Sequence, residues 1–61
     1  MFLKFTESKS NQVIAINPEH VVAVFEAADG DFKGKTVLNL INGSVAIEES
    51  LVTVFGQLAA A

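Results

Sequence analysis

Short apolar runs separated by polar turns extend over most of the chain, and their spacing predicts strands first and one helix last. In residues 2–6, Leu3 and Phe5 alternate with Lys4, which is the period of two expected of a half-buried strand. Further apolar runs, rich in β-branched residues, predict strands at residues 13–16, 21–28, 36–41 and 44–47. Together these runs indicate a small antiparallel sheet.

Two dipeptides mark sharp changes of direction between these strands. Asn17-Pro18 should end the second strand, because proline removes a backbone donor and restricts the residue before it. Asn42-Gly43 lies between two apolar runs and predicts a two-residue type I′ hairpin turn, because both residue types tolerate positive φ. The polar, glycine-containing residues 29–35 predict a longer loop.

The last part of the chain has the period of a helix. Glu48, Glu49 and Ser50 suit a helix start, because acidic groups are stabilised by the positive end of the helix dipole. An apolar stripe at i, i+3, i+4 and i+7 follows, made of Leu51, Val54, Phe55 and Leu58. We therefore expect a single α+β domain over residues 1–61, with one C-terminal helix packed on a small antiparallel sheet of four to five strands.

The third predicted strand has no polar face. Val22 and Val24 fall on one side of it, and Val21, Ala23 and Phe25 on the other. A strand that is apolar on both sides is usually covered on both sides. We expect the helix to cover one side and a second subunit to cover the other.

The composition also predicts association. Of the 61 residues, 51% are hydrophobic and only 18% are charged, against about 25% in an ordinary domain. So short a chain buries only about 60% of the surface that its unfolded form exposes. It has no cysteine for disulfides, and its one histidine cannot supply the four ligands of a structural zinc site. We therefore expect a homo-oligomer without a cofactor.

Charge and the length of the apolar runs narrow the choice of partner. The net charge is −3 and all four basic residues are lysines, whereas nucleic-acid binders carry basic patches, often with arginine. The apolar runs are far shorter than the roughly 20 residues of a membrane span. The first ten residues lack the apolar segment and cleavage site of a signal peptide. These features argue against nucleic acid and membrane, and favour a cytoplasmic protein.

The order of turns, strands and helix start is similar to that of a known family. INPEHVVAVFE (residues 16–26) and TVLNLINGSVAIEESLVTVF (residues 36–55) resemble the flagellar regulatory protein FlbD and related short bacterial proteins. The matching positions are Asn17, Pro18, Val21, Val24, Thr36, Leu38, Leu40, Asn42, Gly43, Val45, Ile47, Glu49, Ser50 and Val54. The resemblance implies a sheet-plus-helix fold and a regulatory role. The loop at residues 29–34 is longer than in that family, and the family's charged helix surface is missing.

Two segments carry partial catalytic or metal-binding patterns. His20 is the only side chain expected to titrate near neutral pH, but its neighbour Glu19 points to the opposite face of an extended chain. We favour a polar turn residue over a catalytic one. Residues 29–31 (Asp-Gly-Asp) begin like a calcium loop, but the twelfth position is Leu40 instead of glutamate. We therefore expect a solvated loop and no enzyme.

The aromatic residues divide into core and surface candidates. Phe25 and Phe55 follow the apolar periods of a strand and the helix, so we expect both in the core. Phe2 and Phe32 fall in an edge strand and a loop, where exposed aromatic residues often mark protein contacts. Phe2 and Phe32 are therefore candidate partner-binding residues.

Lys33 and Lys35 are candidate ligand-binding residues. They flank Gly34, and a glycine between lysines can hold a phosphate through backbone amides. The spacing of a P-loop is absent, and a soluble hairpin tip is the competing interpretation. In a symmetric oligomer, several copies of this loop could meet at one site.

These observations favour one function and leave others open. The first hypothesis is a non-enzymatic oligomeric module, regulatory and bacterial or phage-encoded, that binds a protein partner. The alternative is an oligomer that binds a small anionic ligand such as a nucleotide at subunit junctions. RNA binding is a third hypothesis, disfavoured by the scarcity of basic residues. Catalysis would require a composite site between subunits.

Overall fold

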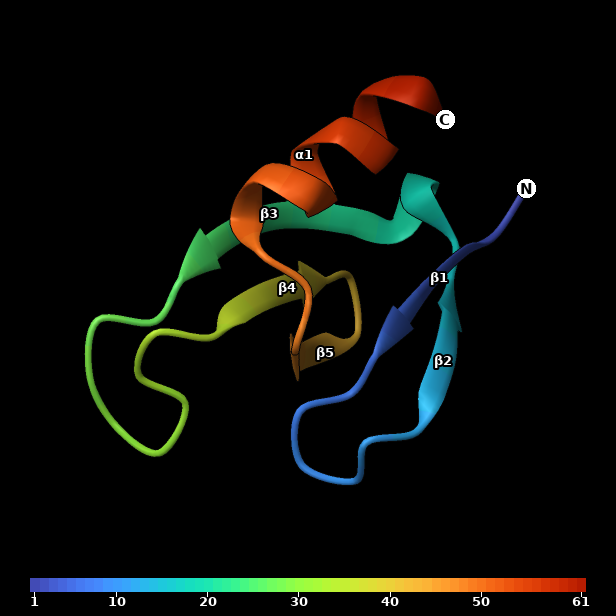
Figure 1. The fold of residues 1–61 in the computed structure, drawn as a ribbon. Helices are drawn as coiled ribbons and strands as arrows, with labels where there is room; N and C mark the ends of the chain where they lie inside the picture. Colours follow the sequence, from blue (N-terminus) through green and yellow to red (C-terminus); the bar gives the residue numbers. More distant parts are fainter.

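The computed structural model describes all 61 residues, as five strands, a short 3-10 helix and one α-helix (Figure 1). The elements are β1 (Leu3–Thr6), β2 (Val13–Ile16), η1 (Pro18–His20), β3 (Val21–Glu26), β4 (Thr36–Leu40), β5 (Gly43–Ile47) and α1 (Leu51–Ala60). The two ends of the chain lie on the same side of the molecule, near η1 and the C-terminal end of α1.

The strands form two sheets, β1-β2 and β3-β4-β5. The antiparallel α+β arrangement with a C-terminal helix is confirmed, whereas the single sheet of four to five strands is wrong. Backbone hydrogen bonds join the two sheets just after β1, at a bridge between Glu7 and Ile47. There the Glu48 N–H donates to the Thr6 carbonyl at 2.8 Å and the Ser8 N–H donates to the Ala46 carbonyl at 2.9 Å. Pro18 has no N–H and starts the η1 turn, so the chain changes direction there instead of pairing β2 with β3.

The core lies between the two sheets and α1. Its fully buried side chains are Phe5 of β1, Leu38 of β4, Ile47 of β5 and Val54 of α1. Partly buried hydrophobic residues surround them, namely Leu3, Ile14, Ile16, Val24, Leu40, Val45 and Leu58. Each of these elements contributes alternate or helically spaced residues, so one small core holds both sheets and the helix together.

The aromatic residue of the core is Phe5, which is 1% exposed. Phe25 and Phe55, predicted as core residues, are 48% and 52% exposed, so that prediction is wrong. In β3 it is Val24 that faces the core, and Phe25, one residue on, points to the opposite face. In α1 the buried residue is Val54, and Phe55 lies about 100° further round the helix.

The hairpin between β4 and β5 turns one residue earlier than predicted. Leu40 pairs with Gly43, so the two loop residues are Ile41 and Asn42. Asn42 is not among the residues with positive φ, and the type I′ turn over Asn42-Gly43 is therefore wrong. A type I turn commonly places glycine directly after its two central residues, which is where Gly43 lies, with φ 151°.

β3 is shorter and less regular than the sequence predicts. It ends at Glu26 instead of residue 28. Its register with β4 moves from the Val21–Leu40 pair directly to the Ala23–Asn39 pair, so Val22 is an extra residue in the ladder. Because of this irregularity, Val22 does not share the core with Val24 and is 64% exposed.

Candidate functional site

Large hydrophobic residues are exposed in greater number than they are buried. Four are fully buried in the core, and nine are exposed. The nine are Met1, Phe2, Val13, Val22, Phe25, Phe32, Ile41, Val52 and Phe55. Apolar groups are stabilised when they leave water, and contiguous exposed apolar surface typically marks a contact with another molecule.

The helix α1 carries two apolar stripes. Ser50 caps its start by accepting a hydrogen bond of 3.2 Å from the Thr53 N–H. Leu51, Val54 and Leu58, three of the four residues of the predicted stripe, are buried or half-buried, whereas the fourth, Phe55, is exposed. The second stripe has the same period and is exposed; it consists of Val52, Phe55, Gly56 and Ala59.

The exposed stripe of α1 was not predicted from the sequence, although its residues follow the same helical period as the inner stripe. No residue of the ten in α1 is charged. Thr53 and Gln57 are its only polar residues, and a helix so largely apolar is normally buried on most sides. Val52, however, is 80% exposed, so the helix has an apolar face without a covering partner in the single chain. Complete burial of Val52 and Phe55 would contribute about 1.5–3 kcal/mol for each side chain.

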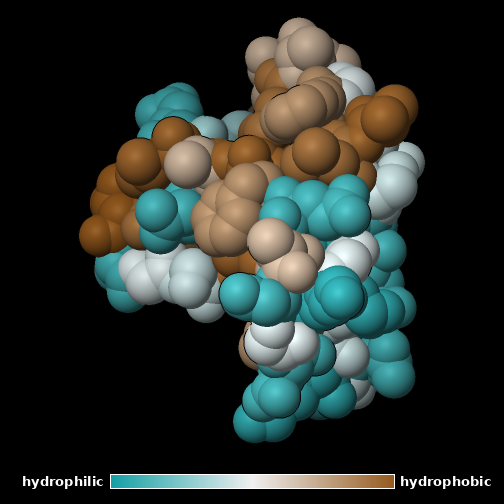
Figure 2. Space-filling model, turned by 90° about the vertical axis from the view of Figure 1, so that its left-hand side faces the viewer, coloured by the Kyte–Doolittle hydropathy of each residue, from teal (hydrophilic) through white to brown (hydrophobic).

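The outer face of the three-stranded sheet is a second apolar area, on the side of the sheet away from α1. Phe25, Val37 and Ala46 lie opposite one another across β3, β4 and β5, but only Phe25 is exposed, since Val37 is half-buried and Ala46 is buried. Glu26 is the only charged residue in the three strands. α1 lies against β3, and Figure 2 shows the hydrophobic residues gathered across the upper part of one face of the molecule, with hydrophilic residues below. α1 packs on the core face of this sheet, so its outer stripe and the face that carries Phe25 point in different directions, and the helix stripe is the main candidate interaction surface.

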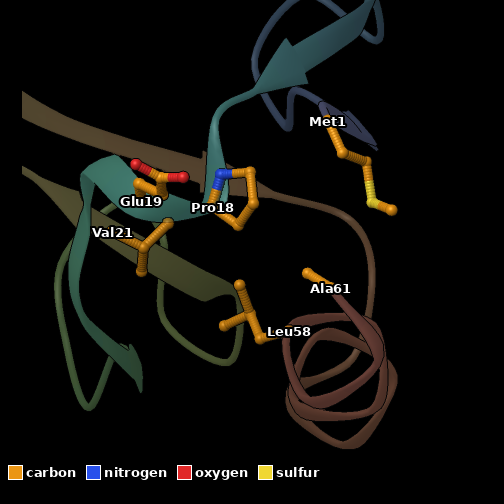
Figure 3. A pocket seen from close by; sticks show the side chains of 6 residues that line it. All are labelled: Met1, Pro18, Glu19, Val21, Leu58 and Ala61. Carbon is orange, nitrogen blue, oxygen red and sulfur yellow. The ribbon is translucent and has the colours of Figure 1, made fainter.

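A single shallow pocket of about 480 Å³ lies where the two ends of the chain meet η1 (Figure 3). Its lining is Met1, Pro18, Glu19, Val21, Leu58 and Ala61. Leu58 points from α1 toward Val21, and Glu19 lies on the rim, on the far side of Pro18 from Met1. The pocket therefore offers an apolar floor without a converging set of polar groups, which a site for a small polar ligand would need.

Glu49 ties the start of α1 to β1. Both oxygens of its carboxylate accept hydrogen bonds from the Thr6 N–H, at 2.9 and 3.0 Å, and Oε2 also accepts one from Thr6 Oγ1 at 3.0 Å. Hydrogen bonds to an ionised acceptor are about twice as strong as neutral ones. This acidic residue, which could be taken for a general acid, therefore has a structural role.

Glu48 belongs to an exposed network that joins β5 to the loop before β4. Its carboxylate accepts a hydrogen bond from the Ser8 hydroxyl and forms an ion pair with Lys35 Nζ at 2.9 Å. The Ser8 hydroxyl, and next the Lys35 ammonium, lower the pKa of the Glu48 carboxyl below its ordinary value of 4.5. The carboxylate is thus held in its charged form, which suits an ion pair and not proton transfer at neutral pH.

The loop at residues 29–35 contains three of the four predicted binding residues. Phe32, Lys33 and Lys35 lie in it. The three backbone N–H groups of residues 33–35 all donate to carbonyls within or beside the loop, those of Gly30, Ala27 and Phe32, at 2.8–3.2 Å. The Lys35 ammonium is paired with Glu48. Neither these amides nor Lys35 is therefore free for a phosphate, and Lys33 alone extends from the loop without a salt bridge.

Phe2 is separate from the other predicted binding residues. It is 66% exposed and lies just before β1, on the side of the chain ends, whereas the loop with Phe32 lies on the opposite side (Figure 1). Exposure of both residues agrees with a surface location. The structure does not bring Phe2, Phe32, Lys33 and Lys35 together into one site.

The remaining polar candidates form no cluster. His20 is exposed at the end of η1, where its carbonyl accepts a hydrogen bond of 3.1 Å from the Ile41 N–H. No three histidine or acidic side chains gather in a way that could hold a metal ion. No helix is long and apolar enough to cross a membrane.

Known proteins offer no guide to the site. Neither protein-family models, nor curated proteins, nor solved structures match this chain. The case for a function therefore depends on the chain's own surface.

Proposed function

We propose that this protein is a non-enzymatic interaction module that acts as a homo-oligomer and binds a protein partner. The observation that carries the proposal is the excess of exposed over buried large hydrophobic residues, nine against four. They include the uncharged outer stripe of α1 and residues of the adjoining β3. The centres of protein interfaces are similarly poor in charged residues and rich in phenylalanine and methionine.

The proposal includes a regulatory role in the cytoplasm, in a bacterium or encoded by a phage. This part is supported by the similarity to the FlbD family. That similarity is based on the turn at Asn17-Pro18, the Asn42-Gly43 pair and the Glu49-Ser50 helix start in the sequence.

Binding of a small anion at subunit junctions is the alternative proposal, and it has less support. Only the Lys33 ammonium is available in the loop, because Lys35 is paired with Glu48. Asp29 and Asp31 lie in the same loop and oppose an anionic ligand.

The first test is the absolute mass in solution, by light scattering after size exclusion over a range of concentrations. A multimer would support the oligomeric part of the proposal. A monomer up to about 1 mM, where even an association of about 4 kcal/mol would be half complete, would overturn it. The partner part is tested by affinity capture from a bacterial lysate and reconstitution from two purified proteins. Failure to reconstitute any captured complex would overturn that part.

A further inference from the structure

We propose that α1 is the place where two copies of this chain meet, with the two helices packed antiparallel about a two-fold axis and the contact extended onto β3. This inference rests on the proposed function, and it names a second copy as the occupant of the exposed helix face. The residues at its centre are Val52, Phe55 and Gly56.

Charge is the first argument for a second copy as the occupant. In a two-fold contact the same patch lies on both sides, so any charge in the patch would face its own copy. None of the eleven charged residues, four lysines and seven acids, lies in α1, and β3 carries one, Glu26, at its last position. With a net charge of −3, two copies would repel each other across most other faces. On the helix face the chain can meet itself without that repulsion.

Gly56 is the second argument. A glycine inside a helix is less favourable than alanine, and here a Cβ at this position would meet no atom within 4 Å. Its φ is not positive, so neither the backbone nor the packing of the single chain requires glycine. Gly56 lies in the exposed stripe, one turn after Val52 and one turn before Ala60. Small residues at such positions let two helices approach closely, which explains a glycine at this point.

The area needed for a stable contact fixes its extent. A specific interface removes about 800 Å² from each partner, which is about a fifth of the 4060 Å² surface of this chain. One face of a ten-residue helix, about 15 Å long and 10 Å wide, covers too little area alone. The contact therefore has to include β3, which lies against α1 and has no strand partner on its outer edge. Val22, which is 64% exposed, provides an apolar group there, whereas Phe25 points to the other face of the sheet.

The test uses the full chain and matched lysine substitutions. Val52→Lys and Phe55→Lys place a charge in the proposed contact, and both positions are too exposed for the fold of the single chain to depend on them. Val13→Lys is the control, because Val13 is 69% exposed on β2, in the other sheet. Light scattering over a dilution series gives the dissociation constant of each variant, and far-UV circular dichroism checks its fold. We expect the dissociation constant to increase by at least about tenfold for the two helix variants and by about twofold or less for the control.

A covalent readout complements the mass measurement. The chain has no cysteine, so single-cysteine variants report one contact each. Phe55→Cys lies at the centre of the proposed antiparallel contact, where a residue meets its own copy, and should form a dimer on mild oxidation, because a disulfide needs two Cα atoms within about 7 Å. Val13→Cys should stay largely monomeric under the same conditions.

The possible outcomes separate this inference from the proposed function. If the unmodified chain is a multimer and the helix variants and Phe55→Cys behave as expected, the inference holds. If the multimer survives Val52→Lys and Phe55→Lys, or if Val13→Lys alone dissociates it, the inference fails while the oligomeric module stands. A chain that is monomeric at every concentration overturns both. Retention of that monomer on vesicles of phosphatidylcholine and phosphatidylglycerol, lost with Val52→Lys, would assign the face to a membrane instead.

Discussion

Replacing Phe5 by alanine tests which aromatic residue builds the core. Phe5 is 1% exposed and shares the core with Leu38, Ile47 and Val54. Removal of a buried phenylalanine side chain lowers the free energy of unfolding by about 3–5 kcal/mol. A chain of 61 residues has about 3–9 kcal/mol of stability in total, at about 0.05–0.15 kcal/mol per residue. We therefore expect Phe5→Ala to lose most or all of its folded population.

Two further variants make this prediction quantitative. Phe5→Leu keeps part of the contacts and removes a smaller volume than Phe5→Ala does. We therefore expect it to lower the free energy of unfolding by about 1–2 kcal/mol. Phe2→Ala is the matched control, since Phe2 lies three residues away and is 66% exposed. A substitution at such an exposed position should change the free energy of unfolding by no more than about 0.5 kcal/mol.

The assay is urea unfolding followed by far-UV circular dichroism, because the chain has neither tryptophan nor tyrosine for fluorescence. All variants are compared at one protein concentration, so that mass action affects the measured stability of each variant in the same way. With a slope of about 1 kcal/mol per molar urea, Phe5→Leu should lower the midpoint by about 1–2 M. If Phe2→Ala lowered it as much as Phe5→Leu, the assignment of Phe5 to the core would be refuted.

Three further predictions follow from individual contacts. Glu49→Gln removes the charge from the hydrogen bonds that tie α1 to β1 and should lower the free energy of unfolding by about 1–2 kcal/mol, measured by the same urea assay. Gly56→Ala should stabilise a monomeric form of the chain by about 1 kcal/mol, because the added Cβ meets nothing, but should weaken self-association in light scattering. The pKa of Glu48 is lowered by the Ser8 hydroxyl and the Lys35 ammonium, so its carboxylate should stabilise the fold fully above pH 4.5 and lose this effect as the pH falls through the lowered pKa. The difference in urea midpoint between the unmodified chain and Glu48→Gln should therefore disappear in acid, and a difference independent of pH would contradict the assignment.

The candidate surface was only partly predictable. Phe2 and Phe32 are exposed as expected, yet they lie on different sides of the molecule. The period of α1 predicted its inner stripe, and the same period also contains the outer stripe with Val52. The outer stripe was missed because an apolar residue in a helix is first assigned to the core of its own chain. A core this small has room for only one stripe.

Local chemistry was enough to predict most of the elements. Alternation over Leu3 and Phe5, the break at Pro18 and the capped helix start at Ser50 each depend on neighbours within a few residues. Such short-range interactions depend directly on the order of amino acids. The sequence by itself therefore determined the number, type and order of the strands and the helix.

Only the tertiary structure decided how these elements share one core. The division into two sheets depends on where β1 meets β5, at residues 40 positions apart in the chain. The burial of Phe5 instead of Phe25 and Phe55 depends on which side chains reach the space between the sheets. These contacts join distant segments, and a local pattern contains no information on which of several apolar residues will occupy a limited volume. The limited volume also leaves Val52 and its stripe at the surface, because close packing admits only as many side chains as the core can hold.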